Sequence, residues 1–117
     1  MSEHQQQVAV VEWFRLQHRD KLIFAIPNGT FIRSIGMRVK AKREGLTKGI
    51  PDLMIPYPCG KYHGLFIEMK DIKKTPCSQS KEQKEKIKQL NELGYFATWA
   101  AGSHIAILII KKYLGDL

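Results

Sequence analysis

The fold is decided between residues 49 and 70, where the chain reads GIPDLMIPYPCGKYHGLFIEMK. Two apolar runs in this stretch are separated by turn-forming residues around Gly60, a pattern typical of a β-hairpin. If the runs pair antiparallel about Gly60, Asp52 lies directly opposite Glu68, and directly opposed side chains are about 4.5–5.5 Å apart. The sequence therefore predicts two neighbouring carboxylates at one end of the hairpin.

The second run of the hairpin adds a lysine to these carboxylates. Side chains alternate between the two faces of a strand, so Phe66, Glu68 and Lys70 share one face. Taken singly, Asp52 could be a turn residue, and Glu68 with Lys70 could be an exposed edge pair. Residues 64–69 are nevertheless apolar enough for a central strand, where an inward-facing charged pair costs free energy unless it is compensated. A divalent cation held by both carboxylates supplies that compensation.

Helices and further strands are expected around this hairpin. The sequence predicts helices at 3–19, 37–44, 80–93 and 103–114, and strands at 22–26 and 95–100. The capping box Ser80-x-x-Gln83 begins the third helix, Leu93 is expected to face the core, and Gly94 ends the helix. The isoleucines of the last segment suit a strand, but its caps and length favour a helix. The order αβ(α)ββαβα predicts an α/β fold with a central mixed β-sheet flanked by helices, in a single domain of residues 1–117.

The composition indicates a basic globular protein. The 117 residues contain 19 basic and 11 acidic side chains, which give a formal net charge of +8. Such an excess is typical of proteins that bind nucleic acid, but ribosomal and membrane-surface proteins are also basic, so the charge alone does not name the partner. The longest apolar run, Ile105 to Ile110, is too short to span a membrane. The two cysteines form no CxxC pair, and no secretory leader precedes them, so we expect the cytoplasm of a bacterial or phage-infected cell.

The basic residues are concentrated between Phe31 and Gly49. This segment has a net charge of +5, because Glu44 is its only acidic residue. We expect its basic side chains to contact phosphates, which positions a nucleic acid without reading its bases. These residues are Arg33, Arg38, Lys40, Lys42, Arg43 and Lys48.

Motifs along nearly the whole chain carry a resemblance to a known family. The motifs are Glu3-His4-x-x-Gln7, Ile26-Pro27-Asn28-Gly29, Lys48-Gly49-Ile50-Pro51-Asp52-Leu53, His63-Gly64-Leu65, Glu68-x-Lys70, Ser80-Lys81-Glu82-Gln83 and Leu93-Gly94-Tyr95. Their ordered combination resembles the VRR-NUC nucleases, in particular the small stand-alone kind found in phages and bacteria. These belong to the PD-(D/E)XK superfamily, so the resemblance implies a restriction-endonuclease-like core.

The resemblance implies a metal-dependent endonuclease that hydrolyses DNA phosphodiester bonds. The implied ligands of one or two Mg²⁺ or Mn²⁺ ions are Glu3, Asp52, Glu68 and the backbone carbonyl of Met69. Glu3 and Glu12 lie on opposite sides of a helix, so only one of them can face the metal. Glu3 is chosen because, together with Gln7, it reproduces the spacing of the family.

Two further residues have implied roles near the reacting phosphate. Lys70 either orients the attacking water or stabilises the developing negative charge, and the sequence leaves both roles open. Gln83 is expected to support the site, since a glutamine after the Glu-x-Lys strand often does so in the superfamily.

The resemblance also implies a homodimer that cuts branched DNA, as Holliday junction resolvases do. No membrane and no small-molecule cofactor besides the metal are expected. Two other interpretations are compatible with the sequence. A non-catalytic nucleic-acid-binding module needs only the basic segment, and an RNA-processing nuclease could use the same scaffold, because no feature distinguishes a 2′-hydroxyl.

Overall fold

A four-stranded mixed sheet forms the centre of the structure, a computed structural model that describes residues 1–27, 32–73 and 78–116. Its strands, in spatial order, are β1 (Phe24–Ala25), β2 (Leu53–Ile55), β3 (Leu65–Lys70) and β4 (Phe96–Ala101). The pairs β1–β2 and β2–β3 are antiparallel, whereas β3 and β4 are parallel. The expected mixed sheet is therefore confirmed. The strand expected at 22–26 is shorter, since only Phe24 and Ala25 pair with β2, opposite Met54 and Leu53.

The register of the hairpin agrees with the sequence prediction. Leu53 pairs with Ile67 and Ile55 pairs with Leu65. This register is centred on Gly60, which has a φ of +58° and so takes the left-handed conformation that favours glycine in tight turns. One step beyond the paired residues, Asp52 and Glu68 face each other.

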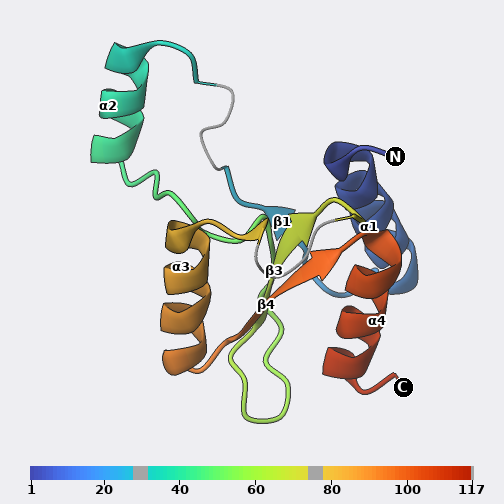
Figure 1. Cartoon of the computed structure of the whole chain (residues 1–117). Helices are drawn as coiled ribbons and strands as arrows, with labels where there is room; N and C mark the ends of the chain where they lie inside the picture. Colours follow the sequence, from blue (N-terminus) through green and yellow to red (C-terminus); the bar gives the residue numbers. More distant parts are fainter. Residues whose placement is uncertain (28–31, 74–77, 117) are drawn as a thin grey trace.

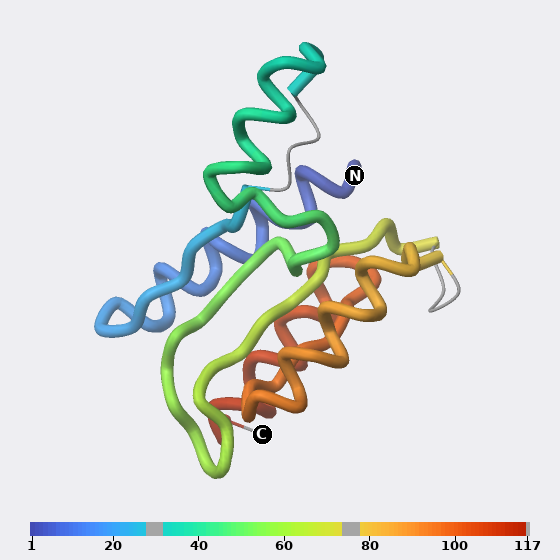
Figure 2. Tube along the Cα trace, turned by 90° about the vertical axis from the view of Figure 1, so that its left-hand side faces the viewer, coloured from blue at the N-terminus to red at the C-terminus, as the bar shows by residue number. Residues whose placement is uncertain are grey.

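Helices cover both faces of the sheet (Figures 1 and 2). The helices are α1 (Glu3–Gln17), α2 (Ile35–Arg43), α3 (Lys81–Glu92) and α4 (Ser103–Leu114). Helices α1 and α4 pack together on one face, and α3 lies on the other. The core lies on the α1 and α4 side, where alternate β3 residues meet apolar side chains of both helices. Its members include Val10, Phe14, Leu65, Ile67, Met69, Ala106 and Ile110.

Local sequence signals explain most helix ends. Ser80 and Gln83 form the expected capping box at the start of α3. The C-terminal segment is a helix, as expected, and it ends at Gly115 in the left-handed conformation. The expectation that Leu93 faces the core is wrong, since its side chain is 66% exposed. Helix α3 ends at Glu92, so Leu93 no longer follows the helical spacing of the apolar residues before it.

Some sequence predictions lie outside the described residues. They concern Asn28 and Gly29 of the Ile26-Pro27-Asn28-Gly29 motif. Within the described part of the chain, no helix is both long and apolar enough to cross a membrane.

Candidate active site

Two buried carboxylates meet at the end of the sheet where β2 begins and β3 ends. Asp52 directly precedes β2 and Glu68 belongs to β3, and their residues are only 8% and 4% exposed. The backbone N–H of Met69 donates a hydrogen bond of 2.7 Å to Oδ2 of Asp52. The sheet register and this bond together fix the two acids next to each other, as the sequence predicts.

The proximity of the two acids changes the protonation of Glu68. Burial, followed by the charge of Asp52 and a hydrogen bond to it, raises the pKa of Glu68 to about 9. Lys70 acts in the opposite direction but does not outweigh these effects. Glu68 therefore keeps its proton at neutral pH, because two buried carboxylates at close range cannot both be ionised without a compensating charge.

A glutamine from α3 joins the acid pair to the lysine. Nζ of Lys70 donates a hydrogen bond of 2.9 Å to Oε1 of Gln83, whose Nε2 donates one of 3.3 Å to Oε2 of Glu68. The same Oε1 also accepts the N–H of Ser80 at 2.9 Å as part of the capping box. Gln83 thus has both roles at once, since it caps α3 and holds the side chains of Glu68 and Lys70 in place.

The comparisons with known proteins agree with this geometry. The VRR-NUC domain model matches residues 1–104. The chain belongs to the VRR-NUC domain family. A solved structure named "VRR_NUC domain protein" is 31% identical, with a TM-score of 0.81, over 98% of this chain and 89% of that chain. A search among curated proteins found no match.

Membership of the VRR-NUC family gives the general activity and the fold. The family is one of nuclease domains, which act on DNA and generally use a divalent metal ion, and the sheet is of the restriction-endonuclease-like kind. The donor set of this chain fits such an ion, because paired carboxylate oxygens are the ligands that Mg²⁺ and Mn²⁺ prefer. A raised pKa at Glu68 is the expected consequence when the acids meet without a cation between them.

The other two expected ligands are placed differently with respect to the acid pair. Met69 directs its N–H toward Asp52, and the carbonyl of a strand residue lies on the same strand edge as its N–H. Glu3 lies in the first turn of α1, and its charge also raises the pKa of Glu68. This effect is smaller than those of burial, Asp52 and Lys70. Among the described residues, no three His, Cys, Asp or Glu side chains form a ready-made ligand group.

Two contacts that the sequence analysis did not predict join the elements around the site. Gln6, rather than Gln7, is buried, and its Oε1 accepts the N–H of Ser103 at 2.7 Å, which ties the start of α1 to the start of α4. Gly49 has a φ of +90°, and a Cβ there would lie 2.5 Å from the backbone carbonyl of Glu82. The turn before the first acid therefore packs directly against the first turn of α3. In the sequence, the one available sign of this contact is the glycine that begins Gly49-Ile50-Pro51-Asp52.

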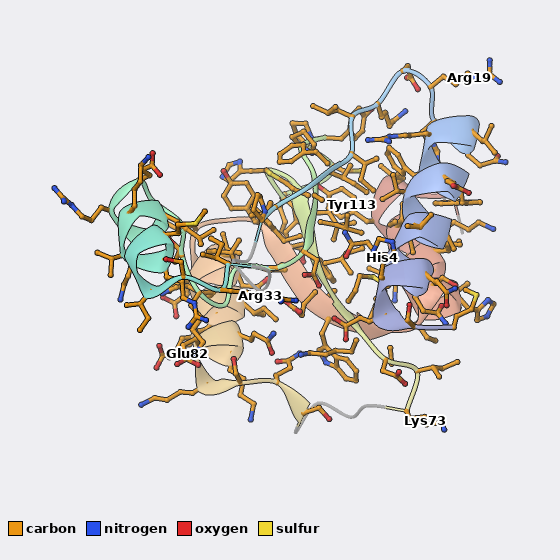
Figure 3. The ribbon with its side chains drawn as sticks, turned by 90° about the horizontal axis from the view of Figure 1, so that it is seen from above. His4, Arg19, Arg33, Lys73, Glu82 and Tyr113 are labelled. Atoms are coloured by element: carbon orange, nitrogen blue, oxygen red, sulfur yellow. The ribbon has the colours of Figure 1, made fainter. Side chains whose placement is uncertain are left out.

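The basic segment is carried mainly by α2, which stands apart from the rest of the protein (Figures 1 and 2). All four basic side chains of α2 are exposed, and in Figure 3 Arg33 lies between α2 and the strands. Arg38 donates hydrogen bonds to the carbonyls of Ile32 and Arg33, so it also stabilises the start of the helix. Lys48 lies 3.7 Å from a carboxylate oxygen of Glu82. The exposed residues Arg33, Lys40, Lys42 and Arg43 remain the main candidates for phosphate contact.

Proposed function

We propose that this VRR-NUC chain is a Mg²⁺- or Mn²⁺-dependent endonuclease that hydrolyses phosphodiester bonds in DNA. The observation that carries the proposal is the buried pair of Asp52 and Glu68, with the pKa of Glu68 raised to about 9. Asp52, Glu68 and the carbonyl of Met69 would hold the ion, and Glu3 would complete the set from α1. When bound, such an ion lowers the pKa of a coordinated water and offsets charge on the phosphate.

Lys70 supplies a positive charge next to the acid pair. It shares a face of β3 with Glu68, and Gln83 fixes its ammonium group through a 2.9 Å hydrogen bond. The ammonium of Lys70 in this position can orient the attacking water or stabilise the negative charge that develops on the phosphate oxygens. Because Gln83 also belongs to the capping box, the start of α3 helps to align the ammonium of Lys70.

The cleavage of branched DNA by a homodimer is the finer part of the proposal. Helix α2 buries none of its residues, and Ile35, Met37 and Val39 are 78%, 63% and 54% exposed. Ile35 and Val39 are four residues apart and therefore share one face of the helix. Exposed apolar side chains that gather on one face mark an interaction surface. A second copy that covers this face would bring two active centres together, so that both strands of a branched duplex can be cut. Sedimentation should show a dimer that Ile35→Glu with Val39→Glu dissociates.

The direct test is a cleavage panel with linear duplex, single strand, flap and four-way junction, in Mg²⁺ or Mn²⁺ and in EDTA. The natural protein should cut at least the junction in a metal-dependent manner, and Lys70→Ala should lose roughly 10²-fold or more of the rate. Lys88→Ala, an exposed lysine of α3, is the matched control and should retain activity. Inactivity of the natural protein on all four DNAs would overturn the proposal. If the protein cuts only RNA strands of matched sequence, its substrate is RNA and not DNA.

A further inference from the structure

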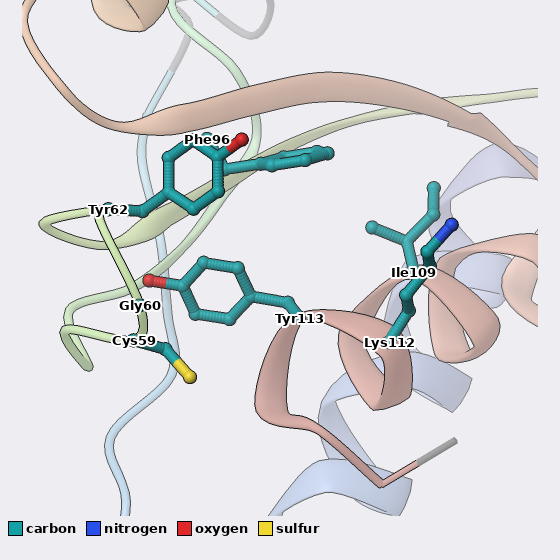
Figure 4. A pocket seen from close by; sticks show the side chains of 7 residues that line it. All are labelled: Cys59, Gly60, Tyr62, Phe96, Ile109, Lys112 and Tyr113. Carbon is teal, nitrogen blue, oxygen red and sulfur yellow. The ribbon is translucent and has the colours of Figure 1, made fainter.

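A pocket of about 490 Å³ lies between the hairpin turn, the start of β4 and the last turns of α4 (Figure 4). Phe96 of this pocket pairs with Leu65, the first residue of β3. Glu68 and Lys70 pair with residues near the far end of β4. The pocket therefore lies at the opposite end of β3 from the candidate active site, and it has no part in the chemistry proposed above.

Three aromatic rings form the wall of this pocket. The rings of Tyr62 and Phe96 have centroids 5.2 Å apart and are nearly perpendicular, and the ring of Tyr113 lies 6.2 and 6.3 Å from them. The hydroxyl of Tyr113 donates a hydrogen bond of 2.8 Å to the carbonyl of Tyr57, which fixes the orientation of its ring. Ile109 closes the opposite side in Figure 4. A planar ring can therefore stack here on a preformed surface.

A lysine gives the lining of the pocket a positive charge. Lys112 lines it from α4. Outside the lining, Nζ of Lys61 lies 5.4 Å from the centroid of the Tyr62 ring. The described residues that line the pocket include no acidic side chain. The charge of the site therefore favours a ligand that joins a flat aromatic ring to an anionic group. The volume lies within the range of about 300–1,000 Å³ that is typical of small-molecule sites.

We propose that this pocket binds one unpaired nucleotide, with the base stacked on one of the rings of Phe96 and Tyr113, whose planes are 68° apart, and the phosphate at Lys112. Aromatic side chains that stack on a base contribute about 1–3 kcal/mol each, without regard to the sequence of the nucleic acid. The nucleotide is either a free monophosphate or a residue that is unstacked from a branched DNA. The proposal rests on the proposed action on nucleic acid, but it requires no cleavage.

Fluorescence of 2-aminopurine, which is quenched when this base stacks, tests the proposal. The titrations use the Lys70→Ala protein in EDTA, so that no strand is cut. 2-Aminopurine riboside 5′-monophosphate should be quenched saturably. Lys112→Ala should weaken its binding about tenfold or more, because a charge-assisted bond to the phosphate is lost, and should leave binding of the corresponding nucleoside unchanged. Lys111→Ala is the matched control, since its ammonium lies 5.9 Å from the Trp13 ring and should leave both affinities unchanged.

A second titration distinguishes the source of the nucleotide. A duplex with one unpaired 2-aminopurine should be quenched, with the same dependence on Lys112, if the pocket takes nucleotides from DNA; quenching of the monophosphate alone would identify a free nucleotide. Absence of saturable quenching with both probes would overturn the proposal, as would equal effects of Lys112→Ala and Lys111→Ala. Because every arm lacks metal, this failure is distinct from an inactive result in the cleavage panel.

Discussion

Uptake of Mn²⁺ by the metal-free protein should release about one proton at pH 7, because a ligand carboxylate must be ionised to coordinate a cation. The pKa of Glu68 is raised to about 9, so at pH 7 only about 1% of this carboxyl is ionised. Each metal-binding event must therefore expel the proton that Glu68 shares with Asp52. For the same reason, the apparent affinity should increase about tenfold for each pH unit between pH 6 and 8.

Isothermal titration calorimetry measures this proton directly. The observed enthalpy of Mn²⁺ binding is recorded in PIPES and in Tris, whose enthalpies of ionisation differ widely, and the difference gives the number of protons released. Glu85→Gln, which removes an exposed carboxylate of α3, should leave the count unchanged. Binding of Mn²⁺ with a proton count near zero would refute the reasoning, because it would show that both carboxylates of the pair are already ionised.

Three further outcomes follow from the same contacts. The metal-free protein should lose stability as the pH rises from about 5 to 9, by up to about 1.4 kcal/mol per unit, because folded Glu68 keeps a proton that the unfolded chain has released. Urea unfolding at pH 6 and 8 measures this loss; Glu68→Gln should abolish it, and a rise in stability would contradict it. Gly45→Ala should lower the free energy of unfolding by about 1–2 kcal/mol, because Gly45 has a positive φ. Gly49→Ala should lower it by at least about 1 kcal/mol more, because the added Cβ also meets the backbone of Glu82. Equal losses of stability in the two variants would exclude the contact between Gly49 and α3. Lys40→Ala with Arg43→Ala should reduce the salt dependence of DNA binding by nearly two units of slope, as measured by fluorescence anisotropy, whereas an unchanged slope would remove α2 from the DNA interface.

The sequence predicts the hairpin and its acids because the signals there are local. A turn centred on Gly60 and period-two alternation are sufficient to bring Asp52 opposite Glu68, and the structure has this register. The capping role of Gln83 is also readable, since the Ser80-x-x-Gln83 pattern places it in the first turn of α3. Its place beside Lys70 is implied only by the resemblance to the superfamily, and the structure shows the hydrogen bond between the two side chains.

Features that depend on contacts between distant segments could not be read in this way. The approach of Gly49 to α3 and the bond from Ser103 to Gln6 join parts of the chain that no periodicity connects. The projection of α2 away from the sheet depends on which surfaces the core leaves uncovered. The aromatic pocket likewise brings Tyr62 and Tyr113 together from opposite halves of the chain.

The central claim is that Asp52 and Glu68 hold a divalent cation at the end of β3. The most direct measurement is anomalous diffraction from crystals of the protein grown or soaked with Mn²⁺ near pH 8. The account predicts an anomalous peak between the two carboxylates, about 2–2.5 Å from their oxygens and beside the carbonyl of Met69. It also predicts that the peak is lost in Asp52→Asn. A well-ordered site without a peak, or a Mn²⁺ ion bound only elsewhere on the chain, would contradict it.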